Sequence, residues 1–159
     1  MNKHTIIERI IAALTADLAI YTHSARDAFA AATDEQSKSE GKYDTRAIES
    51  SYLARGQSLQ AAEIIRAVQD YEKLALRDFG PGEPIHIGAL VELERKTDHT
   101  FYFIGPRAGG TEVECDGQEV LVITPSSPMG QQLVGRKQGD RLQIKVGKAS
   151  DAYRIAAVA

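Results

Sequence analysis

The chain has 159 residues, and its 19 basic and 22 acidic side chains leave a formal net charge of −3, which argues against binding nucleic acid or acidic membranes through overall charge. The single cysteine, Cys115, excludes an internal disulfide, and with four histidines it fails the ligand spacing of a structural zinc site. No run of about 18 apolar residues could span a membrane, and the first residues lack the apolar core of a signal peptide, so we expect a cytoplasmic protein.

The composition changes sharply near the middle of the chain. Residues 1–78 contain no proline and only two of the 13 glycines, whereas all five prolines lie further along. Helices avoid proline and, more mildly, glycine in their interiors, while strand-and-turn domains use both at turns. The change predicts a helical part over residues 1–78, a linker over 79–84 and a β-rich domain over 85–159.

Within the helical part, small and apolar residues recur at alternating steps of four and three, the spacing of a coiled-coil seam. One seam runs through Ile7, Ile11, Leu14, Leu18, Tyr21, Ala25, Ala28 and Ala32, and the other through Ala47, Ser50, Ala54, Gln57, Ala61, Ile64, Val68, Tyr71 and Ala75. The side chains of both seams are bulky near the linker and small near residues 32–47. Antiparallel pairing therefore places bulky side chains beside bulky ones and small side chains beside small ones. We therefore expect one helical hairpin, with its tip at about residues 34–45 and arms about 50 Å long. The alternative is an intermolecular coiled-coil dimer.

The second half alternates with the period of two that is typical of strands. Ile85, Ile87, Ala89, Val91 and Leu93 share one predicted face, and further strands are expected at 101–104, 111–115, 119–123, 141–146 and 153–158. Between them, the run 125–135 begins with serines before proline and ends at glycine, which predicts a short capped helix. The fold class is therefore α+β, a helical hairpin followed by an antiparallel sheet with one short helix.

One run of this domain carries a resemblance to a known family. The run VITPSSPMGQQLVGRKQGDRLQIKV (122–146) closely resembles the C-terminal domain of the bacterial Gre transcription elongation factors, which stimulate transcript cleavage. In them a Ser-Pro-x-Gly segment leads into a short helix, a glycine, and a Gly-Asp turn before a strand. The preceding hairpin matches the other half of the Gre architecture, and residues 37–57 look like a GreA/GreB-like proteobacterial subgroup rather than like GreA or GreB proper.

The resemblance implies an FKBP-like domain over residues 85–159 that docks on RNA polymerase, and a hairpin that enters the secondary channel of that enzyme. In this family, acidic residues at the tip help to hold a second catalytic Mg²⁺ and its water, and the polymerase active site hydrolyses the 3′ end of backtracked RNA. Two-metal hydrolysis needs a second cation beside the nucleophile, and Mg²⁺ prefers a few carboxylates plus retained waters. The chain would then be an accessory factor with no catalytic residues of its own, and Mg²⁺ would be shared with the polymerase.

The tip of this chain departs from the short acidic motif of the family. Its best placed carboxylates are Glu40 and Asp44, which we take as the candidate Mg²⁺ ligands. They alternate with Lys38, Lys42 and Arg46, and the lysines would neutralise the carboxylates and weaken metal binding. The alternative interpretation is a solvated, nearly neutral tip.

The candidate polymerase-binding residues are Ser127, Pro128 and Gly130, for which the alternative role is a purely structural turn. Three functions follow: a factor that stimulates cleavage of backtracked RNA, a channel-binding regulator or inhibitor without cleavage, and a free-standing prolyl isomerase. The absence of Trp argues against the last, because a proline pocket needs an aromatic lining and fold alone confers no activity. The expected partners are RNA polymerase and, only within its complex, the nascent RNA 3′ end; we expect a monomer.

Overall fold

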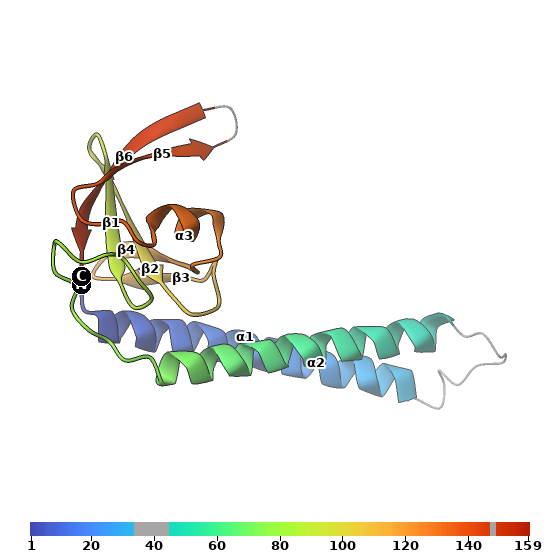
Figure 1. Cartoon of the computed structure of the whole chain (residues 1–159). Coiled ribbons are helices and arrows are strands. Elements are labelled where there is room, and N and C mark those ends of the chain that lie inside the picture. Colours follow the sequence, from blue (N-terminus) through green and yellow to red (C-terminus); the bar gives the residue numbers. More distant parts are fainter. Residues whose placement is uncertain (34–44, 147–148) are drawn as a thin grey trace. The chain divides into compact units, whose positions relative to one another are not determined.

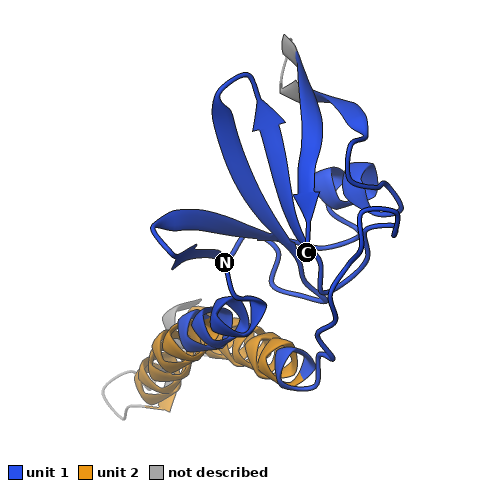
Figure 2. Ribbon diagram, turned by 90° about the vertical axis from the view of Figure 1, so that its left-hand side faces the viewer, with its two compact units in different colours: residues 1–13, 70–159 blue, residues 14–69 orange. Residues whose placement is uncertain are grey.

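The computed structural model describes residues 1–33, 45–146 and 149–159. These residues form two compact units, one of residues 1–13 and 70–159 and one of residues 14–69 (Figure 2). Helices α1 (Lys3–Thr33) and α2 (Thr45–Glu72) contribute to both units, and all six strands lie in the first. No helix within the described ranges is long and apolar enough to cross a membrane.

In the unit of residues 14–69, α1 and α2 run antiparallel, side by side (Figure 1). Every predicted seam position that the structure describes in this unit is buried or half-buried, with Leu14, Ala28, Ala54 and Ile64 buried most completely. The packing is intrachain, so each helix supplies the apolar partner that the seam of the other requires. The predicted helical hairpin is thereby confirmed for the described residues, whereas the tip at 34–44 lies outside them.

The first turns of α1 depart from a simple two-helix seam. Asn2 caps the helix, since its side-chain oxygen accepts the backbone N–H of His4 at 2.9 Å. Ile6 and Ile10 are fully buried although they lie beside the predicted seam, because these turns belong to the unit that contains the sheet. At the other arm, α2 ends at Glu72, so the seam position Ala75 lies beyond the helix and is exposed.

Gly56 offers a test of the helical interior of α2. A Cβ added at Gly56 meets no atom within 4 Å. Because glycine loses more backbone entropy than alanine when a helix forms, we expect Gly56→Ala to raise the free energy of unfolding by about 0.5–1 kcal/mol. Urea denaturation followed by circular dichroism at 222 nm measures this change.

Gly135→Ala is the matched control, because a Cβ there also meets open space but the backbone has a φ of +85°. That left-handed conformation disfavours alanine, so the same substitution should destabilise the protein by about 1 kcal/mol. Equal effects of the two substitutions would contradict the helical assignment of residue 56.

The β domain is a six-stranded sheet with the spatial order β3-β4-β2-β1-β6-β5. Its strands are β1 (Leu90–Arg95), β2 (Asp98–Ile104), β3 (Glu112–Cys115), β4 (Gln118–Ile123), β5 (Arg141–Val146) and β6 (Ala149–Val158). A short helix, α3 (Pro128–Leu133), lies between β4 and β5. The predicted fold class, two helices followed by a sheet with one short helix, is confirmed (Figure 1).

One strand pair differs from the expected antiparallel sheet, because β2 and β4 are parallel and the sheet is therefore mixed. The reason is the tight hairpin of β3 and β4, whose two turn residues, Asp116 and Gly117, both have positive φ. This hairpin places β3 at the sheet edge and β4 beside β2. Because β3 runs opposite to β2 and the hairpin reverses the chain a second time, β4 runs the same way as β2.

The core of the domain gathers apolar residues from the strands, from α3 and from the chain before β1. Its members are Phe79, Ile85, Ala89, Val91, Leu93, Ile104, Ile123, Leu133, Leu142, Ile144, Ile155 and Val158. Ile87 was predicted on the same face as Ile85, but this was wrong: it lies in a turn before β1 and is exposed. The positive φ of the next residue, Gly88, breaks the alternation there.

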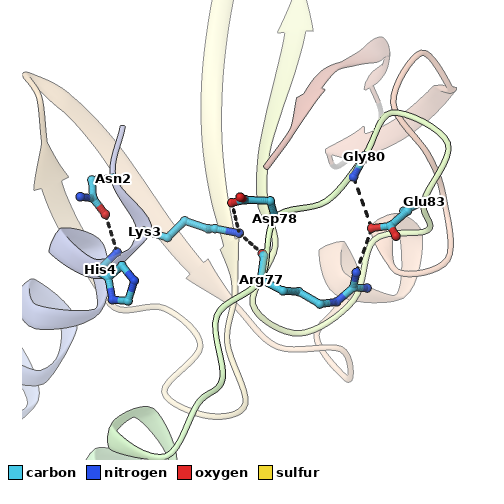
Figure 3. A network of polar contacts seen from close by, with 7 residues as sticks. All are labelled: Asn2, Lys3, His4, Arg77, Asp78, Gly80 and Glu83. Atoms are coloured by element: carbon cyan, nitrogen blue, oxygen red, sulfur yellow. Dashed lines mark hydrogen bonds and ion pairs between the residues drawn. The ribbon is translucent and has the colours of Figure 1, made fainter.

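A polar network ties the start of α1 to the chain after α2 (Figure 3). The amine of Lys3 donates to the carbonyl of Arg77 and lies 4.0 Å from the carboxylate of Asp78. Burial lowers the pKa of Lys3, against the opposing charge of Asp78. Arg77 also donates to Glu83 at 2.8 Å, and Phe79 is buried with the Arg77 guanidinium 4.1 Å from its ring centre. The segment between α2 and β1 is therefore held at several points.

The last turn of α2 is anchored on the loop after β2. Tyr71 is 1% exposed, and its hydroxyl donates to the carbonyl of Arg107 at 2.9 Å. The side chain of Arg107 in turn pairs with Asp70 at 2.6 Å. Burial raises the pKa of Tyr71 well above its usual value, so the phenol stays protonated and remains a donor.

Candidate functional site

The two predicted metal ligands, Glu40 and Asp44, lie outside the described residues, between the end of α1 at Thr33 and the start of α2 at Thr45. Among the residues that the structure does describe, no group of three or more His, Cys, Asp or Glu side chains could hold a metal ion. The assignment of Mg²⁺ to the tip therefore stays a prediction.

The predicted docking residues lie at the start of α3. Ser127 is the N-cap, with φ −67° and ψ 155°, and Pro128 follows at the first helical position. The Ser127 hydroxyl accepts the N–H of Gly130 at 3.0 Å and donates to the carbonyl of Thr124 at 2.7 Å. These are the roles for which serine and proline are favoured at helix starts, because the cap satisfies a backbone donor that the helix leaves free.

Gly130 is required by a close approach of the backbone. A Cβ at this position would lie 1.9 Å from the carbonyl oxygen of Thr124 and 2.8 Å from its carbon. No side chain can be accommodated there without movement of main-chain atoms, since van der Waals contact begins near 3.4 Å. Ser127 and Gly130 therefore fold the chain back on the end of β4, and Thr124 is the third member of this turn.

The remaining features of the run after α3 are also structural. Leu133 is fully buried in the core, and Gly135 has a φ of +85° and donates its N–H to Ile85. Asp140 accepts the N–H of Lys137 through its side chain at 2.9 Å, which closes the turn into β5. The glycines and the aspartate of the motif are thus explained by the backbone conformation that they permit.

The side chain of Arg136 is engaged at the end of α3. Its Nε donates to the carbonyl of Gln132 at 2.6 Å, and this carbonyl is one of the acceptors that a helix leaves unpaired at its C-terminus. The adjacent Lys137 is exposed.

The structure brings the three predicted docking residues together in one turn, where their side chains have different environments. The hydroxyl of Ser127 is taken up by internal hydrogen bonds, and Gly130 is buried. Pro128 is exposed, as are Ser126 and Gln131 on either side of the turn. Pro128 and its exposed neighbours therefore form the surface of this turn, while Ser127 and Gly130 hold its shape. Thr124 had no signal in the sequence, because it acts through its backbone carbonyl.

Comparisons with known proteins give likenesses of low identity. No family model and no curated protein matches the chain. Among solved structures, GreA factor homolog 1 (Gfh1) of Thermus thermophilus is 21% identical, with 94% of each chain covered and a TM-score of 0.39. Thermus aquaticus Gfh1 is 22% identical, with 92% of each chain covered and a TM-score of 0.41. The elongation factor GreA/GreB from Nitrosomonas europaea is 22% identical, over 65% of this chain and 78% of that chain, with a TM-score of 0.38. Identities and TM-scores this low do not show a shared function.

Proposed function

We propose that this protein is a Gre-type transcription factor that binds RNA polymerase through its β domain and reaches the secondary channel with its helical hairpin. The observation that carries the proposal is the run 122–146, whose Ser-Pro-x-Gly, glycine and Gly-Asp elements resemble the Gre pattern in their order. In this protein those elements form one continuous turn–helix–turn that presents Pro128 on the surface. The protein would act through the active site of the polymerase and would have no catalytic residue of its own.

The hairpin supplies the reach that this function needs. Helix α1 has 31 residues and α2 has 28, so each is about 42–46 Å long at 1.5 Å per residue. Glu40 and Asp44 fall in the segment between these helices. A carboxylate donor set suits Mg²⁺, which would supply charge stabilisation and an activated water for hydrolysis when shared with the polymerase. Within that complex, the substrate is the 3′ end of the nascent RNA.

A defined backtracked complex of purified RNA polymerase tests the proposal. With this protein and Mg²⁺, we expect release of short RNA fragments from the 3′ end. The double substitution Glu40→Ala and Asp44→Ala should abolish that release while leaving polymerase binding intact. Cleavage that persists in the double variant would rule out these two residues as metal ligands.

Binding without any fragment release would instead identify a channel-binding regulator, and the alternating Lys38, Lys42 and Arg46 of the tip favour this as the second candidate. If the protein neither binds the polymerase nor causes fragment release, the proposal as a whole is overturned.

The docking surface is tested in the same assay with Pro128→Glu. A first helical position tolerates glutamate, whose charge also suits the helix N-terminus, so the fold should be kept while the exposed surface changes. We expect polymerase binding to weaken by tenfold or more. Gln118→Glu adds the same charge at an exposed site at the opposite end of β4 and should leave binding unchanged. Equal losses for both variants would contradict a docking surface at α3.

A further inference from the structure

A groove runs along the hairpin in the unit of residues 14–69. Helices α1 and α2 border an open hollow of about 800 Å³ that is lined from α1 by residues between Thr22 and Phe29 and from α2 by residues between Ser51 and Ser58. A second hollow of about 410 Å³ shares Ser51 and Arg55 with the first. We call the two together the hairpin groove.

Large apolar side chains border the hairpin groove without being covered. Of its lining residues, Phe29 is 64% exposed, Ile48 50% and Tyr52 71%. Isolated exposed apolar residues are common on protein surfaces, but several along one groove mark an interaction site. The intrachain packing of α1 against α2 does not use these side chains, since the seam passes through Ala25 and Ala54 instead.

The spacing of the bordering residues indicates what kind of partner fits. On α2, the lining residues Ile48, Tyr52 and Arg55 follow steps of four and three, and on α1, Thr22, Arg26 and Phe29 follow the same steps. This is the spacing of a coiled-coil seam, and here it occurs a second time on each helix, beside the seam that joins the two. Two such stripes on either side of one groove are the surface against which a third helix packs.

The charge of the hairpin groove is positive. Arg26 and Arg55 both line it, and none of its lining residues is acidic. Within residues 1–33, 45–146 and 149–159, neither guanidinium has an ion-pair partner, whereas the nearby Asp27 is paired with His23 at 2.8 Å. A partner helix with carboxylates at matching positions would satisfy both arginines. A second copy of this chain would instead bring like charges together.

We propose that the hairpin groove docks an acidic amphipathic helix of a protein partner. The α2 lining from Ile48 to Ser58 is about 15 Å long, so it receives about three turns of helix. Apolar residues of that helix pack on Phe29, Ile48 and Tyr52, and its carboxylates pair with Arg26 and Arg55. This interaction is separate from the docking of α3 on polymerase and does not depend on it.

The experiment uses the full-length protein and two labelled peptides of 14 residues, both helical and both with leucine at seam positions. One carries glutamate on the flanks of the leucine stripe, and the other carries lysine. Fluorescence anisotropy should show binding of the glutamate peptide only. The double variant Arg26→Glu and Arg55→Glu should lose that binding by about tenfold or more, and should gain binding of the lysine peptide.

Two further variants make the result specific to the groove. Arg9→Glu with Arg66→Glu changes the net charge equally at exposed sites outside the groove and should leave peptide binding unchanged. Tyr52→Ser, which keeps both arginines, should weaken binding of the glutamate peptide through loss of apolar contact. Amide chemical-shift changes upon titration should be confined to the lining residues of the two hollows.

Three outcomes would overturn the proposal. One is binding of the glutamate peptide that is insensitive to the charge reversal at Arg26 and Arg55. Another is tighter, charge-dependent binding of a single-stranded RNA of 14 nucleotides at the same residues, which would assign the groove to nucleic acid. A concentration-dependent dimer in sedimentation velocity that Tyr52→Ser abolishes would assign the groove to a second copy of the chain.

Discussion

Gly130→Ala is expected to destabilise the β domain by about 3 kcal/mol or more, and to remove polymerase binding with it. The added Cβ would lie 1.9 Å from the carbonyl oxygen of Thr124. Unlike a flexible side chain, this backbone oxygen cannot move aside without shifting the end of β4, because Thr124 also accepts from the N–H and the hydroxyl of Ser127. The turn would open, and Leu133 would lose its place in the core.

Urea denaturation followed by tyrosine fluorescence measures this loss, since Tyr102 and Tyr153 pack against the core of the domain. Gly82→Ala is the control, because Gly82 is exposed, its added Cβ meets nothing within 4 Å, and its φ lies outside the left-handed range. We expect no measurable loss for the control. A Gly130→Ala variant as stable as Gly82→Ala would contradict the close packing of the turn.

The substitution Ser127→Ala distinguishes the loss of the helix cap from the steric overlap that Gly130→Ala creates. It removes the acceptor for the N–H of Gly130 but adds no atom, so the expected cost is only about 1 kcal/mol. The order of the two losses follows from the structure, because a missing hydrogen bond is partly replaced by water whereas a steric overlap with the backbone is not.

Gly105→Ala is expected to be the second most damaging substitution, at about 3 kcal/mol, through a clash that Tyr71 creates. An added Cβ would lie 2.0 Å from the Tyr71 hydroxyl oxygen and 3.0 Å from both the ring carbon that bears it and a methyl carbon of Val122. Tyr71 is buried at the end of α2 and holds the Arg107 carbonyl, so it has little room to withdraw.

A double-mutant cycle isolates this contact. Tyr71→Phe alone should cost about 1–1.5 kcal/mol, because the Arg107 carbonyl loses its donor. In the Tyr71→Phe background the closest atom to the new Cβ is gone, so Gly105→Ala should cost at least about 1 kcal/mol less than in the wild type. Urea denaturation of the four proteins provides the cycle, and additive losses would show that the clash lies elsewhere.

Local features of the sequence were sufficient for much of the β domain. Ser127, Pro128 and Gly135 predict the start and end of α3 because capping depends on residues within one turn of each other. Asp116 and Gly117 predict the β3–β4 turn because few residues adopt positive φ at both positions. The seams of α1 and α2 predict the hairpin because one face of each helix must be buried.

The tertiary structure alone decided which strands are neighbours and which side chains are free. The pairing of β2 with β4 and the approach of Tyr71 to Gly105 bring together residues that lie far apart in the sequence and carry no local signal of the contact. The tertiary structure also decided the different roles in the turn at α3: Ser127 and Gly130 shape the turn, whereas Pro128 is exposed. Arg26 and Arg55 border one groove only because two helices pack side by side. The sequence by itself determined the elements, since their signals are local; only packing between distant segments decided the sites.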